Sequence, residues 1–172
     1  MRSIVRSTKD FEAWMKKRTD LSKRLLEEKH RKMATGAFPF LRATFYRWVE
    51  RWREKCPKLA RRHDDVLLAV GDLHVGNFGV WLDARGWQVW GVNDFDDACE
   101  LPFTSDLVRL ATSAALAARQ QNIDTTEERL YRFLLDGYRQ GLRSKGKPIL
   151  VSEHEVLRLL TKGTDEDKGG FW

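Results

Sequence analysis

Apolar residues recur at helical spacing near the start of the chain. Within residues 9–30, four of them lie close to one stripe of an amphipathic helix: Phe11, Trp14, Leu21 and Leu25. Charged residues of both signs occupy most of the remaining positions. The pattern predicts a charged amphipathic helix in an N-terminal segment, residues 1–35, that ends just before Gly36.

A second stripe, rich in aromatic residues, predicts a helix over residues 39–54. Its members are Phe38, Leu41, Phe45, Trp48, Val49 and Trp52. Aromatic residues at this spacing are typical of a helix face that packs in a core. Pro57 is expected to close the segment. We expect this helix to open a core segment over residues 36–162, which a loop-like tail over residues 163–172 follows.

The middle of the chain carries strand patterns. Residues 66–70 form a continuous apolar run that ends at Gly71, which favours a buried strand. Residues 78–82 and 87–92 predict a β-hairpin, because the four residues between them end in Gly86. Glycine suits the left-handed position that closes such a connection.

Helical patterns return in the last third of the chain. Thr104 or Ser105 is the expected N-cap of a helix whose small-residue face favours close packing: Leu107, Leu110, Ala111, Ala114 and Ala118. Two more helices are predicted from capping boxes: Asp124 with Glu127, and Ser152 with Glu155. The predicted fold class is α+β, predominantly helical, with a small antiparallel β-hairpin sheet.

Charge and composition narrow the classes of partner. The chain has 31 Lys and Arg against 25 Asp and Glu, a formal charge of +6. Many cations lie in residues 16–32, interleaved with acidic residues, which is typical of a solvated helix face. We therefore do not expect a nucleic-acid partner. The chain lacks an apolar run near the roughly 18 residues of a membrane span and a signal-peptide pattern, so a cytoplasmic protein with no membrane partner is expected.

The candidate chemistry lies in two segments that flank the hairpin. Asp72 follows the predicted strand, Asn77 follows five residues later, and Asp94 leaves the hairpin. Phosphoryl transfer needs a base for the incoming hydroxyl and oxygen ligands for Mg²⁺. The hairpin can fold Asp94 back beside Asn77, so we predict a metal site there and assign Asp72 as the candidate catalytic base. Ordinary turn chemistry is the alternative for Asp72 and Asn77.

Residues 94–97 contain three carboxylates, which repel one another unless a cation lies near. In an extended segment Asp94 and Asp96 share one face, while Asp97 points away. Asp96 is therefore a second candidate metal ligand, and Asp97 is interpreted as structural.

Four further side chains bear on this chemistry. His74 could orient Asp72 or touch a phosphate, and a buried histidine bonded to backbone is the alternative. Arg42 and Arg47 could each pair with the acidic cluster or with a phosphate, and an intramolecular salt bridge is the alternative. Asp106 opens a predicted helix, where the helix dipole stabilises a carboxylate. We take His74 and Arg42 as the candidate cofactor-binding residues.

At these residues the sequence resembles kinase-like enzymes. Val70 to Asn77 and Val92 to Ala98 resemble the HGDxxxxN and IDxxxA signature of aminoglycoside phosphotransferases. A closer resemblance, over about residues 33–115, is to the bacterial kinase-like family catalogued as domain of unknown function 2252. Four blocks carry it: Phe40-Leu41-Arg42, residues 71–79, residues 93–97 and residues 106–110.

The resemblance implies part of a kinase-like catalytic lobe that uses Mg²⁺ and ATP. In that interpretation Asp72 is the catalytic base, and Asn77 and Asp94 hold the metal. The family's Gly-rich loop and ATP-anchoring lysine are expected downstream of these blocks, and no such segment is recognisable in this chain. With Phe171 and Trp172 at its end, we interpret the chain as truncated.

The resulting hypothesis is Mg²⁺-dependent transfer of a phosphoryl group from ATP to a hydroxyl of an unknown small molecule. Two other interpretations stay open. The D-x-D pattern of Asp94 and Asp96 also suits a metal-dependent glycosyltransferase or hydrolase. The missing Gly-rich loop suits a non-catalytic module that associates with itself or with a complementary segment.

Overall fold

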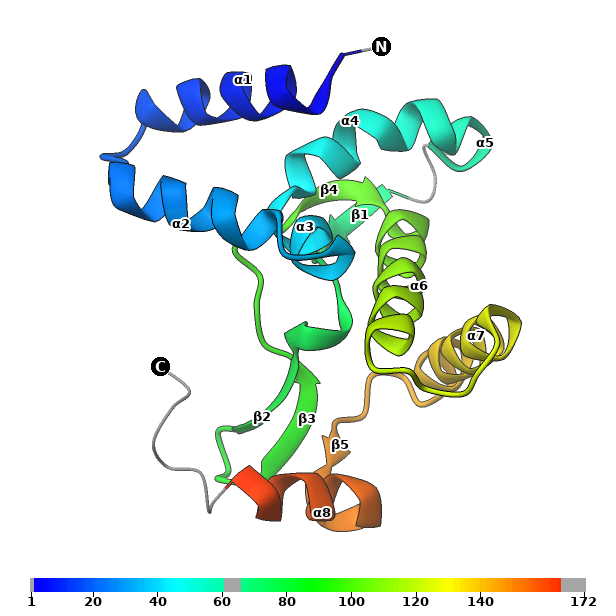
Figure 1. The fold of residues 1–172 in the computed structure, drawn as a ribbon. Helices are drawn as coiled ribbons and strands as arrows, with labels where there is room; N and C mark the ends of the chain where they lie inside the picture. Colours follow the sequence, from blue (N-terminus) through cyan, green and yellow to red (C-terminus); the bar gives the residue numbers. More distant parts are fainter. Residues whose placement is uncertain (1, 61–65, 165–172) are drawn as a thin grey trace. The chain divides into compact units, whose positions relative to one another are not determined.

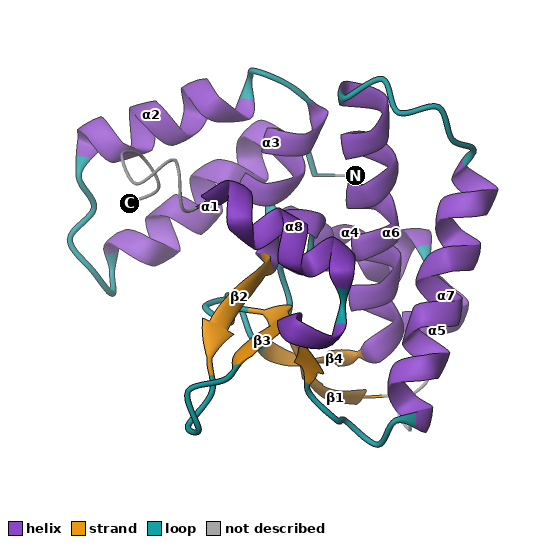
Figure 2. Ribbon diagram, turned by 90° about the horizontal axis from the view of Figure 1, so that it is seen from below, coloured by secondary structure: helices purple, strands orange, loops and turns teal. Residues whose placement is uncertain are grey.

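The computed structural model describes residues 2–60 and 66–164, a mixed α+β chain in which helices predominate (Figure 1). The chain divides into two compact units. The first comprises Met1–His74 and Asp96–Thr125, and the second comprises Val75–Phe95 and Thr126–Trp172. Each unit contains one small antiparallel sheet (Figure 2). The predicted α+β class, predominantly helical, is therefore confirmed.

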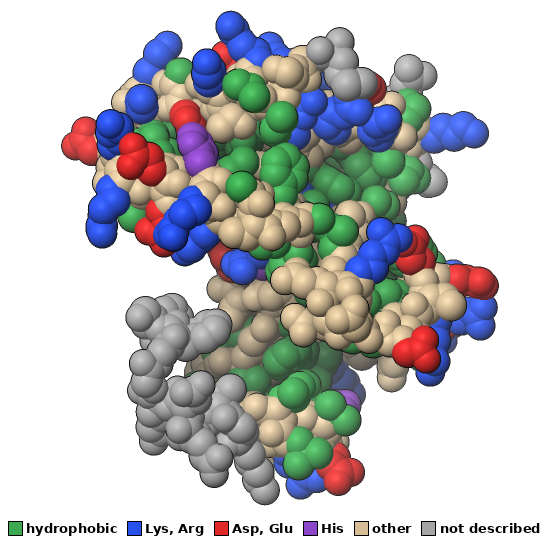
Figure 3. Space-filling view, viewed as in Figure 1, with side chains coloured by type: hydrophobic (Ala, Val, Ile, Leu, Met, Phe, Trp, Pro, Cys, Tyr) green, Lys and Arg blue, Asp and Glu red, His purple; other side chains and the backbone are tan. Residues whose placement is uncertain are grey.

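The N-terminal helix predicted over residues 9–30 is two helices, α1 (Ile4–Lys16) and α2 (Lys23–Met33). The break falls where Thr19, Asp20 and Ser22 cluster, and such side chains compete with the helix for backbone hydrogen bonds. Glu12 of α1 contacts His30 of α2, with 2.5 Å between Oε1 and Nε2. Lys, Arg and acidic side chains are interspersed over these helices, as a solvated surface requires (Figure 3).

The helix predicted over residues 39–54 is also interrupted. It comprises α3 (Ala37–Ala43) and α4 (Phe45–Lys55), which meet at Thr44. Thr44 is buried, and its hydroxyl donates to the carbonyl of Phe40 at 2.7 Å. This local bond offers the backbone an alternative to a continuous helix. Pro57 follows the end of α4, as predicted, and opens the short helix α5 (Pro57–Ala60).

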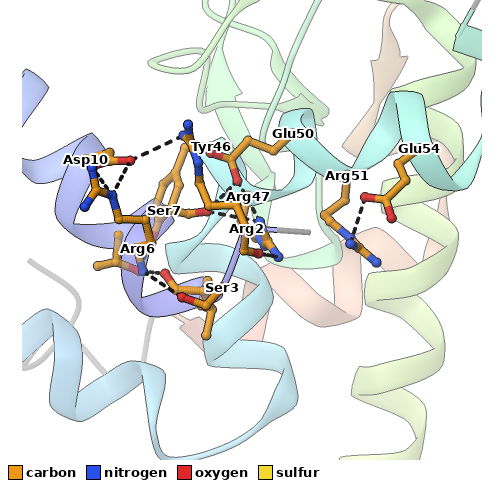
Figure 4. Close-up of polar contacts among 12 residues, drawn as sticks. Arg2, Ser3, Arg6, Ser7, Asp10, Tyr46, Arg47, Glu50, Arg51 and Glu54 are labelled. Carbon is orange, nitrogen blue, oxygen red and sulfur yellow. Dashed lines mark hydrogen bonds and ion pairs between the residues drawn. The ribbon is translucent and has the colours of Figure 1, made fainter.

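Polar contacts around the buried side chain of Ser7 join α1 to α4 (Figure 4). Ser7 is 1% exposed; its hydroxyl donates to Glu50 Oε2 at 2.6 Å and accepts from Arg47 Nη1 at 3.0 Å. Arg47 also donates directly to Glu50, at 2.8 Å. The intramolecular salt bridge that was the alternative for Arg47 is therefore the observed one.

The strand predicted over residues 66–70 is β1 (Val66–Ala69), which pairs antiparallel with β4 (Cys99–Pro102). The strand is confirmed, but its predicted burial is wrong. Only Ala69 is buried, whereas Leu68 is 74% exposed. A continuous apolar run implies cover on both faces, and among the described residues this two-stranded sheet lacks such cover over Val66, Leu67 and Leu68.

The long helix α6 (Phe103–Gln120) follows β4 directly. The predicted caps are wrong: Pro102 occupies the N-cap position, and Ser105 instead accepts a hydrogen bond from Trp48 Nε1 at 3.0 Å. Of the predicted small-residue face, Ala118 is buried and the other four residues are not. The buried residues of α6 are Ser105, Asp106, Arg109, Ser113, Ala115 and Ala118. Polar groups therefore occupy much of the helix face that packs inward.

The second unit confirms the predicted hairpin. Strands β2 (Phe78–Leu82) and β3 (Gln88–Val92) pair antiparallel from Phe78 opposite Val92 to Leu82 opposite Gln88. Gly86 closes the turn with φ +78°, in the left-handed region. The short strand β5 (Ile149–Leu150) pairs with the other edge of β3. Val89 and Val151 are the buried apolar residues of this unit among those described.

Two helices complete the second unit, α7 (Glu127–Arg143) and α8 (Glu155–Thr164). Thr126, rather than the predicted Asp124, caps α7 by accepting from the amide of Arg129 at 3.2 Å. Ser152 lies within the 3₁₀ turn Val151–Glu153 that precedes α8. The first two residues of the predicted tail, Gly163 and Thr164, are helical and end α8, and the rest of the tail, with Phe171 and Trp172, lies outside the described residues. None of the helices described is long and apolar enough to cross a membrane.

Candidate functional site

The turn that follows β1 is shaped by a carboxylate from α6. Asp106 accepts backbone hydrogen bonds from Val70, at 2.7 Å, and Gly71, at 3.2 Å. Burial raises the pKa of Asp106, and these two amides and the charge of Arg109 oppose that rise. Asp106 therefore fixes the backbone immediately before Asp72, a role more specific than the helix-dipole interaction predicted for it.

Gly71 is required by this turn. Its φ is +86°, and a Cβ at this position would overlap the carbonyl oxygen of Asp97. The backbone of residues 70–72 therefore passes close to the start of the segment that leads into β4. This close approach also brings the charge of Asp97 near Asp72, whose pKa it raises.

Asp72 is paired with a fully buried arginine. Arg109 of α6 is 0% exposed, and its Nε donates to Asp72 Oδ1 at 2.9 Å. Its Nη2 donates both to the same Oδ1 and to the carbonyl of Leu41, at 2.7 Å for the latter. Removing one partner of a buried ion pair is strongly destabilising, so the positions of Asp72 and Arg109 depend on each other.

Burial raises the pKa of Asp72 to about 6. The attraction of Arg109 and its hydrogen bonds oppose that rise, Asp97 adds to it, and Arg42 reduces it. The side chain of Asp72 keeps 17% of its surface exposed. The carboxylate is thus a proton acceptor that is partly accessible and titrates near neutral pH, which is the range in which a general base works best.

His74 and Arg42 lie beside this pair. His74 is 1% exposed, and its Nε2 accepts from Arg42 Nε at 3.1 Å. An arginine nitrogen can only donate, so His74 Nε2 is the acceptor in this bond. The same Nε2 lies 3.7 Å from Asp72 Oδ2, beyond hydrogen-bond reach. The structure therefore brings Arg42, His74 and Asp72 together in the first unit.

The predicted metal ligands Asn77 and Asp94 both belong to the second unit. Asn77 is 3% exposed and ends the 3₁₀ turn Val75–Asn77 that leads into β2. Its carbonyl accepts from the amide of Asn93 at 2.9 Å, which continues the hairpin ladder. Asp94 follows Asn93 and is exposed. The hairpin thus returns Asp94 to the neighbourhood of Asn77, as its register predicted.

Asp96 and Asp97 belong to the first unit and are both exposed. Asp97, which we interpreted as structural, is the residue of the acidic segment whose charge reaches Asp72 and Arg109. Within the described residues, no group of three or more His, Cys, Asp or Glu side chains is arranged to hold a metal.

Two residues of this site, Arg109 and Asp106, were not assigned their roles from the sequence. They contact Asp72 and Gly71 from more than 30 positions away along the chain. The available signal was a charged pair about one helical turn apart, Asp106 and Arg109, in a helix whose other residues before Arg119 are uncharged. Such a pair on an inward face requires buried partners.

Comparison with known proteins identifies a family. The model of a family described as an uncharacterized protein conserved in bacteria, domain of unknown function 2252, matches residues 21–167. No curated protein and no solved structure is matched. The matched residues include α6 and the whole turn after β1, with Asp72, His74 and Arg109. By this match the chain belongs to the bacterial family of domain of unknown function 2252.

Proposed function

We propose that this chain carries the catalytic-base half of a kinase-like phosphotransferase site. The reaction is transfer of a phosphoryl group from ATP, with Mg²⁺, to a hydroxyl of a small molecule. The observation that carries the proposal is Asp72, a carboxylate with a pKa of about 6 that arginine holds at a strand end. Above that pH the carboxylate is ionised and can accept the proton of an incoming hydroxyl.

The metal is assigned to Asn77 and Asp94, with Asp96 as a second candidate. Magnesium prefers oxygen ligands, and at phosphoryl-transfer sites it binds one or two carboxylates together with substrate phosphates and water. The amide oxygen of Asn77 and the carboxylate of Asp94, at adjoining ends of the hairpin, fit that ligand set. A bound Mg²⁺ would neutralise charge on the phosphates.

Arg42 and His74 are assigned to the phosphates of the nucleotide. Arg42 uses its Nε to bind His74, and a guanidinium has further N–H groups that can bind phosphate oxygens. His74 Nε2 holds Arg42 in this orientation. In this proposal Arg42 is the phosphate ligand and His74 positions it, while Asp72 accepts the proton.

A second candidate function is a non-catalytic module that a partner completes. Val66, Leu67 and Leu68 of β1 favour it, because these consecutive apolar residues are 43%, 48% and 74% exposed. Exposed apolar patches mark interaction surfaces in many proteins. Such a module would associate with a partner yet form no ADP from Mg²⁺-ATP.

The test of the first proposal is Asp72→Asn, with Asp136→Asn as the control, because Asp136 is an exposed residue of α7 that pairs only loosely with Arg139. ADP formation from Mg²⁺-ATP is measured with a panel of sugars, aminocyclitols and nucleosides as acceptors. Loss of a general base is expected to reduce turnover by at least ~100-fold. Asp136→Asn should match the wild type. Equal turnover by Asp72→Asn, or no ADP formation by the wild-type chain with any acceptor, would contradict the proposal.

A further inference from the structure

Two glycines lie directly opposite each other in the hairpin of the second unit. Gly79 of β2 pairs with Gly91 of β3, next to the pair that opens the ladder. Neither glycine has a positive φ, so the backbone does not require glycine at either position. Glycine weakens the interior of a strand and often marks the close approach of another group. The reason for this pair is therefore to be found in what lies over it.

A side chain lies over each of the two glycines. A Cβ at Gly79 would be 2.5 Å from Asn93 Nδ2, and a Cβ at Gly91 would be 2.8 Å from Cη2 of the Trp81 ring. Because the two glycines are directly opposite, both groups lie on the same face of the hairpin. The glycine pair thus allows an indole ring and a carboxamide to lie close against one patch of the sheet.

Both groups are accessible to solvent. Trp81 is 41% exposed, and Asn93 is exposed as well. Within the described part of the chain, the carboxamide of Asn93 has no hydrogen-bond partner. Beside the ring the same face is covered, because Val89, directly opposite Trp81, is 4% exposed. The patch therefore combines an aromatic surface with a polar group that can fix orientation, which is the combination found at small-molecule sites.

The patch adjoins the candidate metal ligands. The backbone amide of Asn93 donates to the carbonyl of Asn77 at 2.9 Å, and Asp94 is the next residue along the chain. A molecule bound to Asn93 would therefore lie near a metal held by Asn77 and Asp94. In phosphoryl transfer the acceptor must lie beside the metal-bound terminal phosphate, whereas the ribose and two further phosphates separate that phosphate from the base of ATP. This position suits the acceptor better than the base.

We propose that Trp81 and Asn93 bind the acceptor, and that the acceptor is a neutral polyhydroxylated ring such as a sugar or a cyclitol. This inference rests on the proposed function, because it names the substrate class of that reaction. The C–H face of such a ring packs on the indole. Its hydroxyls both donate and accept, as a carboxamide does. Both protein groups of the patch are uncharged, which matches a neutral ring.

The test is a titration of the wild-type chain with glucose and with myo-inositol, followed by nuclear magnetic resonance in the absence of ATP and metal. The observed signals are the indole N–H of Trp81 and the side-chain NH₂ of Asn93. Both should shift along one binding curve with at least one of the two compounds. Trp87, which is 50% exposed and lies under Arg85, is the internal control and should not shift. No shift at Trp81 and Asn93 with either compound would overturn the proposal.

Two variants test the arrangement of the patch. Asn93→Ala removes an exposed side chain and should weaken binding roughly 10-fold, the effect of one good hydrogen bond. Gly91→Ala must displace the edge of the Trp81 ring, the far end of a flexible side chain, so it should fold and also bind more weakly. Gly137→Ala is the control, because its Cβ would meet open space in the same unit. Wild-type affinity in both Asn93→Ala and Gly91→Ala would overturn the proposal.

Adenosine is the probe for the other kind of ring that can pack on an indole. If the signals of Trp81 and Asn93 followed adenosine and neither polyhydroxylated compound, the patch would bind the base of ATP, and the acceptor assignment would be overturned. The titration requires no turnover. Binding of glucose or myo-inositol that Asn93→Ala weakens, without ADP formation from Mg²⁺-ATP, would therefore count against the proposed phosphotransfer and not against this site.

Discussion

At the scale of single residues, the pKa of Asp72 has a consequence for stability. The folded-state pKa of about 6 lies above the ordinary value near 3.8, so the folded chain holds this proton more tightly. The contribution of Asp72 to the free energy of unfolding is therefore fully present below about pH 4 and is lost as the pH rises through about 6. Thermal unfolding of wild type and Asp72→Asn from pH 4 to 7 measures this contribution.

The expected result is a difference in stability between the wild type and Asp72→Asn that changes over pH 4 to 6 and levels off above pH 6. Over that range the wild type loses stability relative to the variant. The variant cannot titrate at this position, which makes it the reference. A difference that grows in the opposite direction would mean that Arg109 outweighs burial and depresses the pKa of Asp72.

A second prediction at this scale concerns Gly71. Alanine there must adopt a left-handed conformation and also overlap the carbonyl of Asp97. Gly86→Ala is the matched control, since Gly86 has φ +78° and open space around its Cβ position. The control isolates the conformational cost, roughly 1–2 kcal/mol. Gly71→Ala should lose clearly more stability in urea unfolding, and equal losses would show that the close approach to Asp97 is absent.

The sequence singles out the local residues of the candidate site but not the distant residues that contact them. Asp72, Asn77 and Asp94 could be singled out from strand ends and spacing, and the hairpin register follows from the turn at Gly86. Arg109 could not be paired with Asp72, because that contact depends on how α6 packs beside β1. The contact between Arg109 and Asp72 forms because both side chains are buried together, and the periodicity of the sequence does not show which distant residues are buried together.

At the scale of elements, the contact between α1 and α4 offers a direct test. Ser7→Ala removes a buried hydroxyl that bonds both Glu50 and Arg47, while those two residues still bond each other. The expected loss is about 1 kcal/mol in the free energy of unfolding. Ser22→Ala is the control, because Ser22 makes no capping bond with its side chain and is exposed.

Urea unfolding followed by circular dichroism measures both variants. Ser22→Ala should stay within about 0.5 kcal/mol of the wild type. If Ser7→Ala did the same, α1 would be held by its aromatic contacts, such as Phe11 stacked on Tyr46 at 4.3 Å, and not by this polar network.

Elements bounded by glycine or proline were predicted well, and interruptions without them were missed. The hairpin closed by Gly86 has the predicted strands, and Pro57 follows the end of α4. The break at Thr44 has no such signal, because a threonine hydroxyl can bond a carbonyl within a continuous helix as well as at a break. Burial of Thr44, a tertiary property, accompanies the break.

At the scale of the whole molecule, exposed apolar side chains on α7 predict association. Tyr131, Leu135 and Leu142 lie at helical spacing and are 36%, 42% and 63% exposed. Leu135→Lys combined with Leu142→Lys should lower the apparent mass in light scattering at high protein concentration. Gln140→Lys adds charge at another exposed position of α7 and should not change that mass. A monomeric wild type at all concentrations would contradict this prediction.

At this scale the sequence predicted the fold class correctly but not the arrangement of the elements. Mixed α+β content followed from periodicity, and family membership followed from short blocks around Asp72 and Asp94. The division into two units did not follow, because each unit is assembled from segments that are separated in sequence. Periodicity relates residues that are close along the chain, but it does not show which distant segments share a core.

The most direct test of the phosphotransferase account is the thermal midpoint of the chain with Mg²⁺ alone and then with Mg²⁺-ATP. A ligand at 100 times its Kd stabilises the folded state by about 2.7 kcal/mol. The account predicts a rise with Mg²⁺-ATP that Asp94→Asn abolishes and that the exposed control Asp124→Asn keeps. No rise in the wild type, or the same rise in Asp94→Asn, would contradict the assignment of Mg²⁺ and ATP to this site.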